Sequence, residues 1–542
     1  MTYTLTTPLY YVNDRPHLGS AYTTLACDAL ARFQRLRGEP VLFITGCDEH
    51  GQKIQRTAEA AGLTPQRHCD GVSAQYSELW QRWQISHDRL IRTTDPRHRR
   101  IVEQFYARVE ASGDIVEGRQ QGWYCVACEE FKDDPHEAQD PDCPIHRRPL
   151  EWRDEINLFF RLSRYQQAIE ELINRPGFVE PASRRHEVEN FVRQGLRDFS
   201  ISRIHLPWGI PVPGHDGHTF YVWFDALLGY LTALLEEGDA ADLDTALARG
   251  WPAAVHVIGK DILRFHAVYW PAMLLSAGLP LPQRVFGHGF LTREGQKMGK
   301  SLGNVLDPEL LLERCGADAV RWYLLRDIPF GEDGDFQQQR FQDLVNNDLA
   351  NTIGNLLNRT ASMARKWFSE AVPPAALAAE PDHPLAQRCL SALAPYTEAF
   401  ERFEFRTACE TVLQLAGEAN GYLNERAPWK LMKQEGQAET VAADLYAVLE
   451  TCRWLGVLLA PLLPDLSGRI LSQLGEPPFD SGRPASQAQD QHGSSGGVGD
   501  PDRGAAADSP WCRALRWGLL PCGRILSEPS PVMQRLELDA PL

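Results

Sequence analysis

The sequence contains no hydrophobic run long enough to cross a bilayer. Its longest apolar stretch, residues 454–463, ends in Pro461 and Pro464 and predicts a buried helix end. The first residues lack the basic and apolar regions of a secretory signal and the arginine-rich character of a transit peptide. Nine of the 12 cysteines are scattered singly, which is typical of reduced core thiols. We therefore expect a cytoplasmic protein with no membrane segment.

The chain also lacks an excess of positive charge, because 55 Lys and Arg residues stand against 72 Asp and Glu residues and the net charge is −17. A polyanionic partner would have to meet local basic patches. Neither a Walker pattern nor a dinucleotide-binding glycine pattern is present, and we find no internal repeat. With 542 residues, 43% of them hydrophobic, the chain predicts several globular domains and excludes wholesale disorder.

What is present is an alternation of strand and helix patterns. The order strand, helix, buried strand occurs at residues 3–7, 21–37 and 41–44 and again at 254–258, 263–277 and 284–286. Such units form parallel sheets whose ligands bind beyond the carboxyl ends of the strands. We predict two halves of one Rossmann-like, doubly wound parallel sheet, separated by an insertion.

The second part of the chain has an almost wholly helical pattern. Helices are predicted at residues 346–366, 384–403, 405–424 and 441–459. Residues 480–509 are nearly devoid of large apolar side chains and predict a disordered loop. The expected domains are the α/β domain in two parts (1–115 and 223–340), an inserted domain (116–222), a helical bundle (341–475), the low-complexity loop (476–510) and a segment that packs back on the helical domain (511–542).

A phosphate-binding turn is predicted where the first strand gives way to the first helix. His17, Gly19 and Ser20 lie at this helix start. Free backbone N–H groups and the positive end of the helix dipole favour a phosphate there, Gly19 allows close approach of a base or sugar, and His17 can donate to phosphate oxygens. From the residues alone, an ordinary turn with Ser20 as the helix cap is the alternative.

Two lysines flank a glycine in a polar loop much later in the chain. Lys297, Lys300 and Ser301 belong to the segment Lys-Met-Gly-Lys-Ser, hereafter the lysine motif (residues 297–301). Two such cations suit the negative charge that spreads over a phosphoryl or nucleotidyl transition state. Taken alone, a solvated surface loop is the simpler interpretation.

A cysteine cluster in the insertion has the spacing of a zinc site. Cys125 and Cys128 are followed, after 14 intervening residues, by Cys143 and His146. Four such ligands in two knuckles (about residues 123–149) predict one tetrahedral zinc with no open position, hence a structural metal. A redox pair or core thiols are the alternative, which flanking charged residues such as Glu129 disfavour.

The chain resembles the class I aminoacyl-tRNA synthetases, and closely the methionyl-tRNA synthetases. Residues 17–20 match the family's His-x-Gly-His signature and the lysine motif its Lys-Met-Ser-Lys-Ser loop. Residues 10–13, 45–51, 221–226, 258–262 and 427–429 support the likeness, which covers about residues 3–470. Ser20 stands where a second His is usual, and Gly299 where Ser is usual.

The resemblance implies a methionine–tRNA ligase. ATP, with Mg²⁺, would activate L-methionine to methionyl-adenylate, and methionine would pass to the 3′ end of its tRNA, including initiator tRNA. The implied catalytic residues are His17, Lys297 and Lys300, and Gly19, Ser20 and Ser301 would join them in binding ATP. No side-chain nucleophile is expected, because the protein positions reactants and neutralises charge.

A methionine pocket is also implied. The resemblance assigns Asp48 to the ammonium group and makes the walls from Leu9, Tyr11, Trp223, Ala226, Leu227, Tyr230, Ile262, His266 and Trp270. A thioether needs a soft, aromatic-lined pocket, and an ammonium needs a carboxylate. Without the family, most of these residues would be interpreted as core, and His266 as a satisfied core histidine.

An anticodon-reading surface is implied in the helical domain. Asn355 and Arg359 lie four residues apart on one helix face, and Pro428 and Trp429 begin a second helix. Arg and Asn can contact base edges and Trp can stack an unpaired base. The residues alone favour a solvated face and an ordinary helix start, whereas the resemblance makes these positions anticodon readers.

Two rival functions must be considered, one because Ser20 and Gly299 differ from the family signatures and one that is judged by the size of the insertion. A non-catalytic RNA-binding descendant is favoured by Ser20 and Gly299 and disfavoured by the retained His17, Gly19 and lysines. A synthetase for leucine, isoleucine or valine would normally carry a much larger hydrolytic insertion. We expect the ligase to act as a monomer, with ATP, methionine and the acceptor end and anticodon of tRNA(Met) as partners.

Overall fold

The computed structural model describes residues 2–126, 129–132, 141–143, 147–204, 206–298, 304–374, 378–479, 509–538, 540 and 542. The chain forms two compact units, which we name by their main elements. The sheet unit comprises Met1–Pro16, Leu42–Gln81 and His87–His288, and the helical unit comprises His17–Val41, Arg82–Ser86 and Gly289–Leu542. No helix among the described residues is long and apolar enough to span a membrane.

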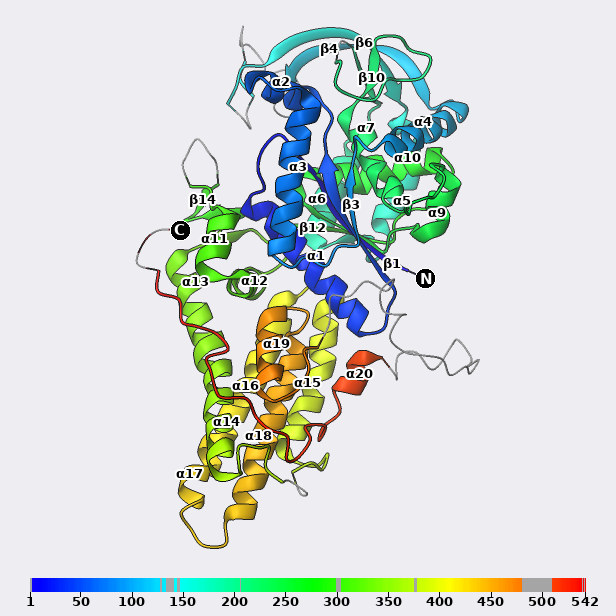
Figure 1. Ribbon diagram of the computed structural model, residues 1–542. Helices are drawn as coiled ribbons and strands as arrows, with labels where there is room; N and C mark the ends of the chain where they lie inside the picture. Colours follow the sequence, from blue (N-terminus) through cyan, green and yellow to red (C-terminus); the bar gives the residue numbers. More distant parts are fainter. Residues whose placement is uncertain are drawn as a thin grey trace, which may run out of the picture. The chain divides into compact units, whose positions relative to one another are not determined.

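The sheet unit is built on a six-stranded sheet of order β3-β2-β1-β11-β12-β7 (Figure 1). Its strands are β1 (Tyr3–Tyr11), β2 (Val41–Asp48), β3 (Arg89–Arg92), β7 (Val179–Glu180), β11 (Val255–Gly259) and β12 (Val285–His288). β1 pairs with β11, β11 with β12, β12 with β7 and β2 with β3, all in parallel. Strands buried on both faces need the near-continuous apolar runs seen in the sequence. The predicted parallel sheet is confirmed.

One predicted helix of this unit is not continuous. In place of a single helix over residues 263–277, the chain forms η2 (Lys260–Ile262), a π-helix η3 (Phe265–Tyr269) and α10 (Trp270–Ser276). Pro271 stands at the start of α10. Proline lacks an N–H and its ring clashes with the carbonyl four residues earlier, so the preceding turn widens. The prediction of an unbroken helix was wrong at this point.

The predicted insertion contributes strands to three sheets. Four of its strands form an antiparallel sheet of order β5-β4-β6-β8, from β4 (Ile115–Cys125), β5 (Glu130–Lys132), β6 (Glu151–Phe160) and β8 (Phe199–Ser200). β9 (Ser202–Ile204) pairs with β10 (His218–Phe220). β7, from the same segment, is the edge strand of the parallel sheet. The remaining helices of the sheet unit are α2 (Gln52–Ala60), α3 (Pro65–Arg82), α4 (Pro96–Ala111), η1 (Leu162–Tyr165), α5 (Gln166–Asn174), α6 (Ala182–Arg193), α7 (Val222–Leu227), α8 (Gly229–Thr232) and α9 (Leu243–Gly250).

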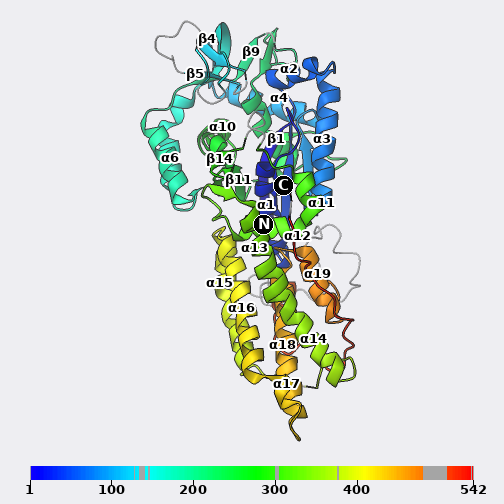
Figure 2. The same cartoon turned by 90° about the vertical axis from the view of Figure 1, so that its left-hand side faces the viewer.

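The helical unit contains the four helices that the sequence predicts. They are η5 with α14 (Val345–Gly354 and Asn355–Trp367), α15 (Pro384–Glu401), α16 (Phe405–Arg426) and α18 (Ala438–Leu459). α15 packs on α16, α16 on α18, and α18 on α19 (Pro464–Gln473), and these helices run side by side in Figures 1 and 2. The first predicted helix differs, because its first part, η5, is a π-helix. The other elements are α1 (Leu18–Leu36), α11 (Pro308–Cys315), α12 (Ala317–Arg326), α13 (Gln338–Leu344), α17 (Pro428–Leu431), α20 (Pro510–Ala514) and the sheet β14-β13-β15 (Gln296–Lys297, Leu291–Arg293 and Gly334–Phe336).

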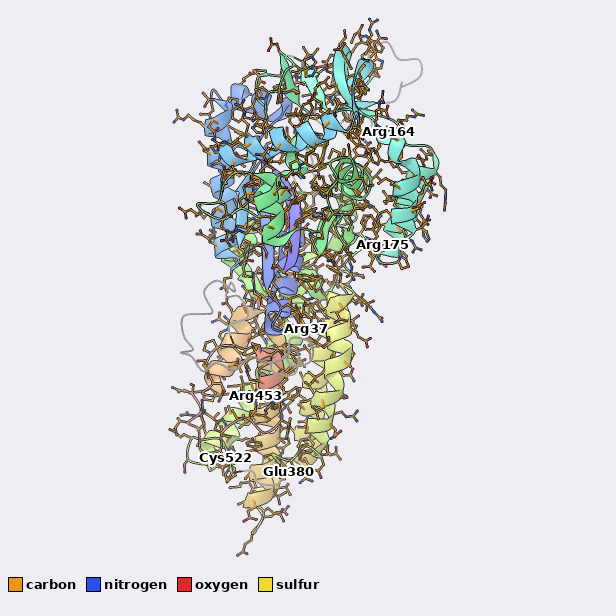
Figure 3. All side chains as sticks on the ribbon, turned by 90° about the vertical axis from the view of Figure 1, so that its right-hand side faces the viewer. Arg37, Arg164, Arg175, Glu380, Arg453 and Cys522 are labelled. Carbon is orange, nitrogen blue, oxygen red and sulfur yellow. The ribbon has the colours of Figure 1, made fainter. Side chains whose placement is uncertain are left out.

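The segment after residue 508 lies against the helices of this unit. The ring of Trp511 stacks on Tyr396 at 5.6 Å. Arg453 of α18, labelled in Figure 3, forms a buried ion pair with Glu450 and donates to the backbone oxygens of Ala514 and Arg516. Residues 480–508 of the predicted disordered loop lie outside the described residues.

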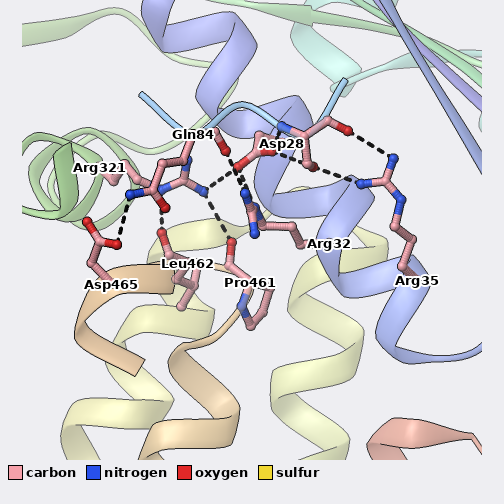
Figure 4. Close-up of polar contacts among 9 residues, drawn as sticks. Asp28, Arg32, Arg35, Gln84, Arg321, Pro461, Leu462 and Asp465 are labelled. Carbon is pink, nitrogen blue, oxygen red and sulfur yellow. Dashed lines mark hydrogen bonds and ion pairs between the residues drawn. The ribbon is translucent and has the colours of Figure 1, made fainter. Parts of the chain in front are cut away.

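A buried carboxylate ties α1 to the rest of the helical unit (Figure 4). Asp28 forms ion pairs with Arg32 at 2.8 Å and Arg321 at 2.7 Å, and it accepts hydrogen bonds from the backbone and hydroxyl of Ser86. Arg321 also donates to the carbonyl of Leu462. The two arginines outweigh the effect of burial and hold the pKa of Asp28 well below its usual range. A buried ion pair of this kind is costly to break.

We expect Asp28→Asn to destabilise the helical unit by about 3 to 5 kcal/mol, because two buried guanidinium groups lose their counter-charge. A lowered carboxyl pKa contributes stability that is present above the unfolded-state pKa and is lost as the pH falls towards the folded-state value. The loss should therefore be largest near neutral pH and should diminish in acid. Thermal unfolding at several pH values measures it. Glu401→Gln, which breaks the exposed pair with Arg37, should cost about 0 to 1 kcal/mol, and equal losses would contradict the assignment.

Candidate functional site

The phosphate-binding turn predicted from the sequence begins α1, in the helical unit. His17 is the N-cap residue, and its Nδ1 accepts from the backbone N–H groups of Gly19 at 3.1 Å and Ser20 at 3.3 Å. These two N–H groups are therefore engaged by His17, and the interpretation of Ser20 as the cap was wrong. Because Nδ1 accepts, the neutral imidazole carries its proton on Nε2. The exposed His17 ring can thus donate a hydrogen bond.

The lysine motif begins in a small hairpin of the same unit. β13 and β14 pair antiparallel, with Arg293 opposite Gln296 and Thr292 opposite Lys297. Asp335 accepts from the Thr292 hydroxyl and the Gly295 backbone, both at 2.7 Å, and so fixes the turn. Gly295 has a φ of +75°, a conformation that glycine adopts without strain. Lys300 and Ser301 lie outside the described residues.

Asp48, the predicted ammonium ligand, ends β2 in the sheet unit. It is 7% exposed, and its Oδ1 has no hydrogen-bond partner among the described residues. Burial and the negative charges of Asp225 and Glu129 raise the pKa of Asp48 well above its usual range. The site therefore holds a buried carboxylate whose negative charge is not compensated, which is the environment that a cationic group would stabilise.

Tyr11, at the end of β1, shares this acidic environment. Its hydroxyl donates to Glu129 at 2.9 Å, and the same carboxylate accepts from the Lys53 backbone at 2.8 Å. Gly51 has a φ of +115°, and a side chain there would collide with Glu129 and the Tyr11 hydroxyl. Sequence analysis missed Glu129 and took it as an exposed flank of the zinc knuckle. Its partner is 118 residues away in the chain, and no local pattern signals such a contact.

Asp225, the second carboxylate near Asp48, is compensated by two histidines. His50 and His98 each bond one of its oxygens at 2.6 Å, and His98 also bonds Thr232 at 2.8 Å. These contacts outweigh burial and lower the pKa of Asp225 to about 2. The group comes from α4, α7, α8 and the segment after β2, all in the sheet unit, and sequence analysis did not find it. It supplies a permanent negative charge beside Asp48.

The residues predicted to form the thioether pocket include a neutral polar pair. His266, in the π-helix η3, bonds the Ile262 carbonyl at 3.1 Å through Nδ1 and the Tyr230 hydroxyl at 2.9 Å through Nε2. Burial lowers the pKa of His266 to about 4, so the ring is uncharged at neutral pH. Since a carbonyl only accepts, Nδ1 carries the proton and Nε2 accepts from Tyr230.

The other predicted pocket residues surround this pair to different degrees. The Trp223 ring stacks on Phe265 at 4.0 Å and meets His266 edge to face at 6.5 Å. Leu9 is partly buried and packs on Gly229, and Ile262 is also partly buried. Ala226, Leu227 and Trp270 are buried in the core, where Trp270 contacts Phe105 and Trp251. Phe265 is a further candidate that sequence analysis missed, because it resembles any core aromatic residue.

The cysteine site is partly described. Cys125, at the end of β4, and Cys143 are both buried and belong to one cluster with Leu150. The Arg147 backbone N–H donates to the Cys143 carbonyl, and the Cys143 N–H donates to the Arg148 carbonyl. Cys128 and His146 lie outside the described residues. Among the residues that are described, no group of three or more His, Cys, Asp and Glu side chains could hold a metal.

The predicted anticodon readers meet at one end of two helices of the helical unit. The Arg359 guanidinium lies over the Trp429 ring at 5.6 Å and donates to Asn424 at 3.1 Å. Asn355 is exposed one turn before Arg359, and Pro428 is buried at the first position of α17. Ala427, with a φ of +43°, makes the turn that places Trp429. Asn424 was missed because an exposed Asn late in a helix usually has no role.

A doubly wound parallel sheet joined to a helical bundle, with the His17 turn and the lysine motif, defines a class I tRNA synthetase. The family model "tRNA synthetases class I (M)" matches residues 3–136 and 132–361, and "Anticodon binding domain of methionyl tRNA ligase" matches residues 372–491. The chain belongs to the methionyl-tRNA synthetase family. Its activity is that of a methionine–tRNA ligase, which joins methionine to tRNA at the expense of ATP with Mg²⁺.

Named relatives agree with this assignment. The methionine–tRNA ligase of Synechocystis sp. is 53% identical over 99% of this chain and 98% of that protein. The chloroplastic/mitochondrial ligase of Arabidopsis thaliana is 48% identical over 99% of this chain and 83% of that protein. Among solved structures, Mycobacterium tuberculosis methionyl-tRNA synthetase in complex with methionyl-adenylate is 37% identical, with a TM-score of 0.87 over 98% of this chain and 100% of that one. The rival functions, a non-catalytic descendant and a synthetase for another amino acid, are excluded.

We expect Asp48→Asn to stabilise the unliganded protein at neutral pH. A carboxyl whose folded-state pKa is raised binds its proton more tightly when folded, so the wild type gains stability as the pH falls through that raised pKa. The asparagine variant carries no such charge and should have the higher melting temperature at pH 8, with the difference shrinking in acid. Asp216→Asn, at an exposed turn, should leave the melting temperature unchanged. A less stable Asp48→Asn protein at pH 8 would contradict the assignment.

Proposed function

We propose that Asp48 binds the ammonium group of methionine. The main support for this role is the buried Oδ1 of Asp48, which has no hydrogen-bond partner among the described residues. The negative charge of this carboxylate is also not compensated. An ammonium ion supplies both the missing donor and the missing charge. The methionyl-adenylate bound to the mycobacterial relative supports the same class of ligand here.

The thioether is assigned to the neutral pocket around His266 and Tyr230. Leu9, Tyr11, Trp223, Ala226, Leu227, Ile262 and Trp270 complete the proposed set. Because His266 is held neutral and both of its ring nitrogens are engaged, the His266 ring offers neither a charge nor a free ring nitrogen to a competing polar side chain. A soft, polarisable sulfur can enter such a pocket at low desolvation cost. The pocket thus favours methionine over polar amino acids.

The proposed chemistry takes place on ATP. The methionine carboxylate attacks the α-phosphate, the bond to the β-phosphate oxygen breaks, and pyrophosphate leaves with Mg²⁺. His17, with Nε2–H as donor, Gly19 and Ser20 bind ATP, and Lys297, Lys300 and Ser301 neutralise the charge of the leaving pyrophosphate. The terminal ribose hydroxyl of the tRNA then attacks the adenylate carbonyl and releases AMP. His17, Lys297 and Lys300 are the catalytic residues in this proposal.

Asp48→Asn tests the assignment of the amino-acid site. Losing one partner of a buried ion pair costs about 3 to 5 kcal/mol, so the KM for methionine in pyrophosphate exchange should rise roughly a hundredfold or more. Asp216→Asn is the matched control and should retain the wild-type KM. An unchanged KM in Asp48→Asn would remove the carboxylate from the ammonium site.

The zinc site is assigned to Cys125, Cys128, Cys143 and His146. Cys125 and Cys143 fit this role, because they lie buried in one cluster although 17 residues stand between them in the chain. A zinc bound by four protein ligands would hold the two knuckles together and take no part in the reaction. The chain is further proposed to be a monomer, and the singly scattered cysteines support a cytoplasmic location.

Metal analysis of the purified protein should find one zinc per chain. The double variant Cys125→Ala, Cys143→Ala should lose it, because two ligands cannot retain a structural zinc. Cys522→Ala, which removes an exposed thiol, should keep full occupancy. Stoichiometric zinc in the double variant would refute the assignment.

The anticodon of tRNA(Met) is assigned to Asn355, Arg359, Pro428 and Trp429. The contact of Arg359 with Trp429 supports the proposal, because it leaves a cation and an aromatic ring together at a partly exposed helix start. A base can stack on the ring while Asn355 and Arg359 reach its edges.

Trp429→Ala should impair tRNA charging and spare methionine activation. Loss of one base stack costs about 1 to 3 kcal/mol, or roughly fivefold to a hundredfold in charging efficiency. Pyrophosphate exchange, which needs no tRNA, should remain at the wild-type rate. The matched control is Trp152→Ala, at an exposed tryptophan of the sheet unit. Equal losses in both assays would make Trp429 a folding residue.

A further inference from the structure

An extended C-terminal segment is held by a row of amide side chains on one helix face. Residues 535–538, 540 and 542, hereafter the strap, run along η5 and α13 and belong to the red end of the chain in Figure 1. Asn346 accepts from the Leu536 backbone N–H at 2.7 Å and donates to the Leu536 carbonyl at 3.0 Å. Gln342 accepts from the Leu538 N–H at 3.3 Å. These contacts are made to backbone and do not depend on the strap's side chains.

Gln338 makes the largest number of these contacts. Its side-chain nitrogen donates to the carbonyls of Leu538 at 3.3 Å and Ala540 at 3.0 Å, and its oxygen accepts from the Leu542 N–H at 2.7 Å. Gln338, Gln342 and Asn346 are spaced by four residues, about 6 Å along a helix. Two residues of extended chain span about 6.6 Å. The side-chain amides on this helix face are therefore spaced almost like every second residue of an extended chain. They make the hydrogen bonds to the strap that the backbone of a neighbouring β-strand would otherwise make.

The end of the strap is held by the hairpin from which the lysine motif emerges. Arg293 of β13 donates to a main-chain oxygen of Leu542 at 2.9 Å, and Arg314 donates to the Ala540 carbonyl at 3.3 Å. Arg293 lies opposite Gln296 in the β13–β14 pair, one residue before Lys297. β15, which pairs with β13, ends only two residues before Gln338. The hairpin is thus held from both sides, by β15 and through Arg293 by the strap.

The other end of the strap is fixed close to the helix that carries the proposed anticodon readers. Arg535 bonds Asn351 of η5 at 2.5 Å, and Val532 packs on Gly354, the residue before Asn355. Contacts of residues 532–542 that the structure describes therefore extend from the start of α14 to the lysine hairpin, all within the helical unit.

We propose that the strap positions the lysine motif for adenylate formation and that Arg293 is the positioning residue through which it acts. This inference rests on the role proposed above for Lys297 and Lys300. The strap does not touch the reactants. The strap limits the movement of the β13–β14 hairpin, and the lysine motif begins in β14. A displacement of about 1 Å in a group that neutralises transition-state charge can cost about a hundredfold in rate.

The test compares neighbouring glutamines of α13. Gln338→Leu removes three contacts to the strap, whereas Gln339→Leu removes only a bond to Asp343 and is the matched control. In single-turnover adenylate formation, Gln338→Leu and Arg293→Gln should each be roughly ten- to a hundredfold slower, with the KM for methionine unchanged. Arg293→Lys, which keeps a donor, should recover part of the rate, and Gln339→Leu should match the wild type. Combining Gln338→Leu with Arg293→Gln should slow the step no further, because both act through the strap.

Two additional measurements make the result decisive. Trypsin should cleave after Lys297 or Lys300 faster in Gln338→Leu than in Gln339→Leu, which reports release of the hairpin without using activity. Lys300→Ala should slow adenylate formation. If it does not, the proposed role of the motif fails. If Lys300→Ala slows the step while Gln338→Leu and Arg293→Gln leave both its rate and the cleavage unchanged, only the strap proposal is overturned. A lower melting temperature with a normal rate would likewise reduce the strap to a stabilising element.

Discussion

The helical unit depends on one buried carboxylate. Asp28 lies in the middle of α1 and binds Arg32 of the same helix, Arg321 of α12 and Ser86 of a separate segment. Because a charge in the interior is stable only with its full set of partners, these elements can adopt one relative arrangement. The His17 turn is the N-terminus of that helix, so a proposed ATP-binding group stands at the end of a helix whose middle is anchored by this buried charge. This explains why α1 belongs with the helices, although the sequence places it between two strands of the sheet.

The buried acidic residues of the sheet unit differ in the number of partners that their carboxylates have. Asp225 is balanced by His50 and His98, and Glu129 accepts from Tyr11 and the Lys53 backbone, whereas Asp48 keeps an oxygen with no partner among the described residues. The contacts made by Asp225 and Glu129 fix the surrounding strands and helices. Their charges also make the ionised form of Asp48 unfavourable until a cation arrives. The unpartnered Asp48 carboxylate therefore lowers the stability of the unliganded protein, and a bound cation would restore that stability.

The sequence predicted most of the secondary structure, because apolar periodicity depends on local spacing. Strands of the parallel sheet and the long helices follow from such spacing, and the interruption at Phe265–Tyr269 could have been inferred from Pro271. The candidate site was reached through short motifs and their resemblance to a family. Glu129, Asn424 and the amides at 338, 342 and 346 were beyond reach, because their partners lie far away in the chain and an isolated Gln or Asn resembles a solvated surface residue.

The departure at Ser20 is explained by the way in which the turn is capped. The family signature has a second histidine there, but the backbone N–H of Ser20 is already engaged by His17, and the Ser20 side chain is buried in the first turn of α1. The geometry of the helix start therefore depends on His17 and on the backbone, both of which the chain retains. Serine at position 20 therefore lacks the second imidazole, but the backbone contacts that orient the His17 ring are kept. The signature can thus change at its last position while the turn that holds His17 stays intact.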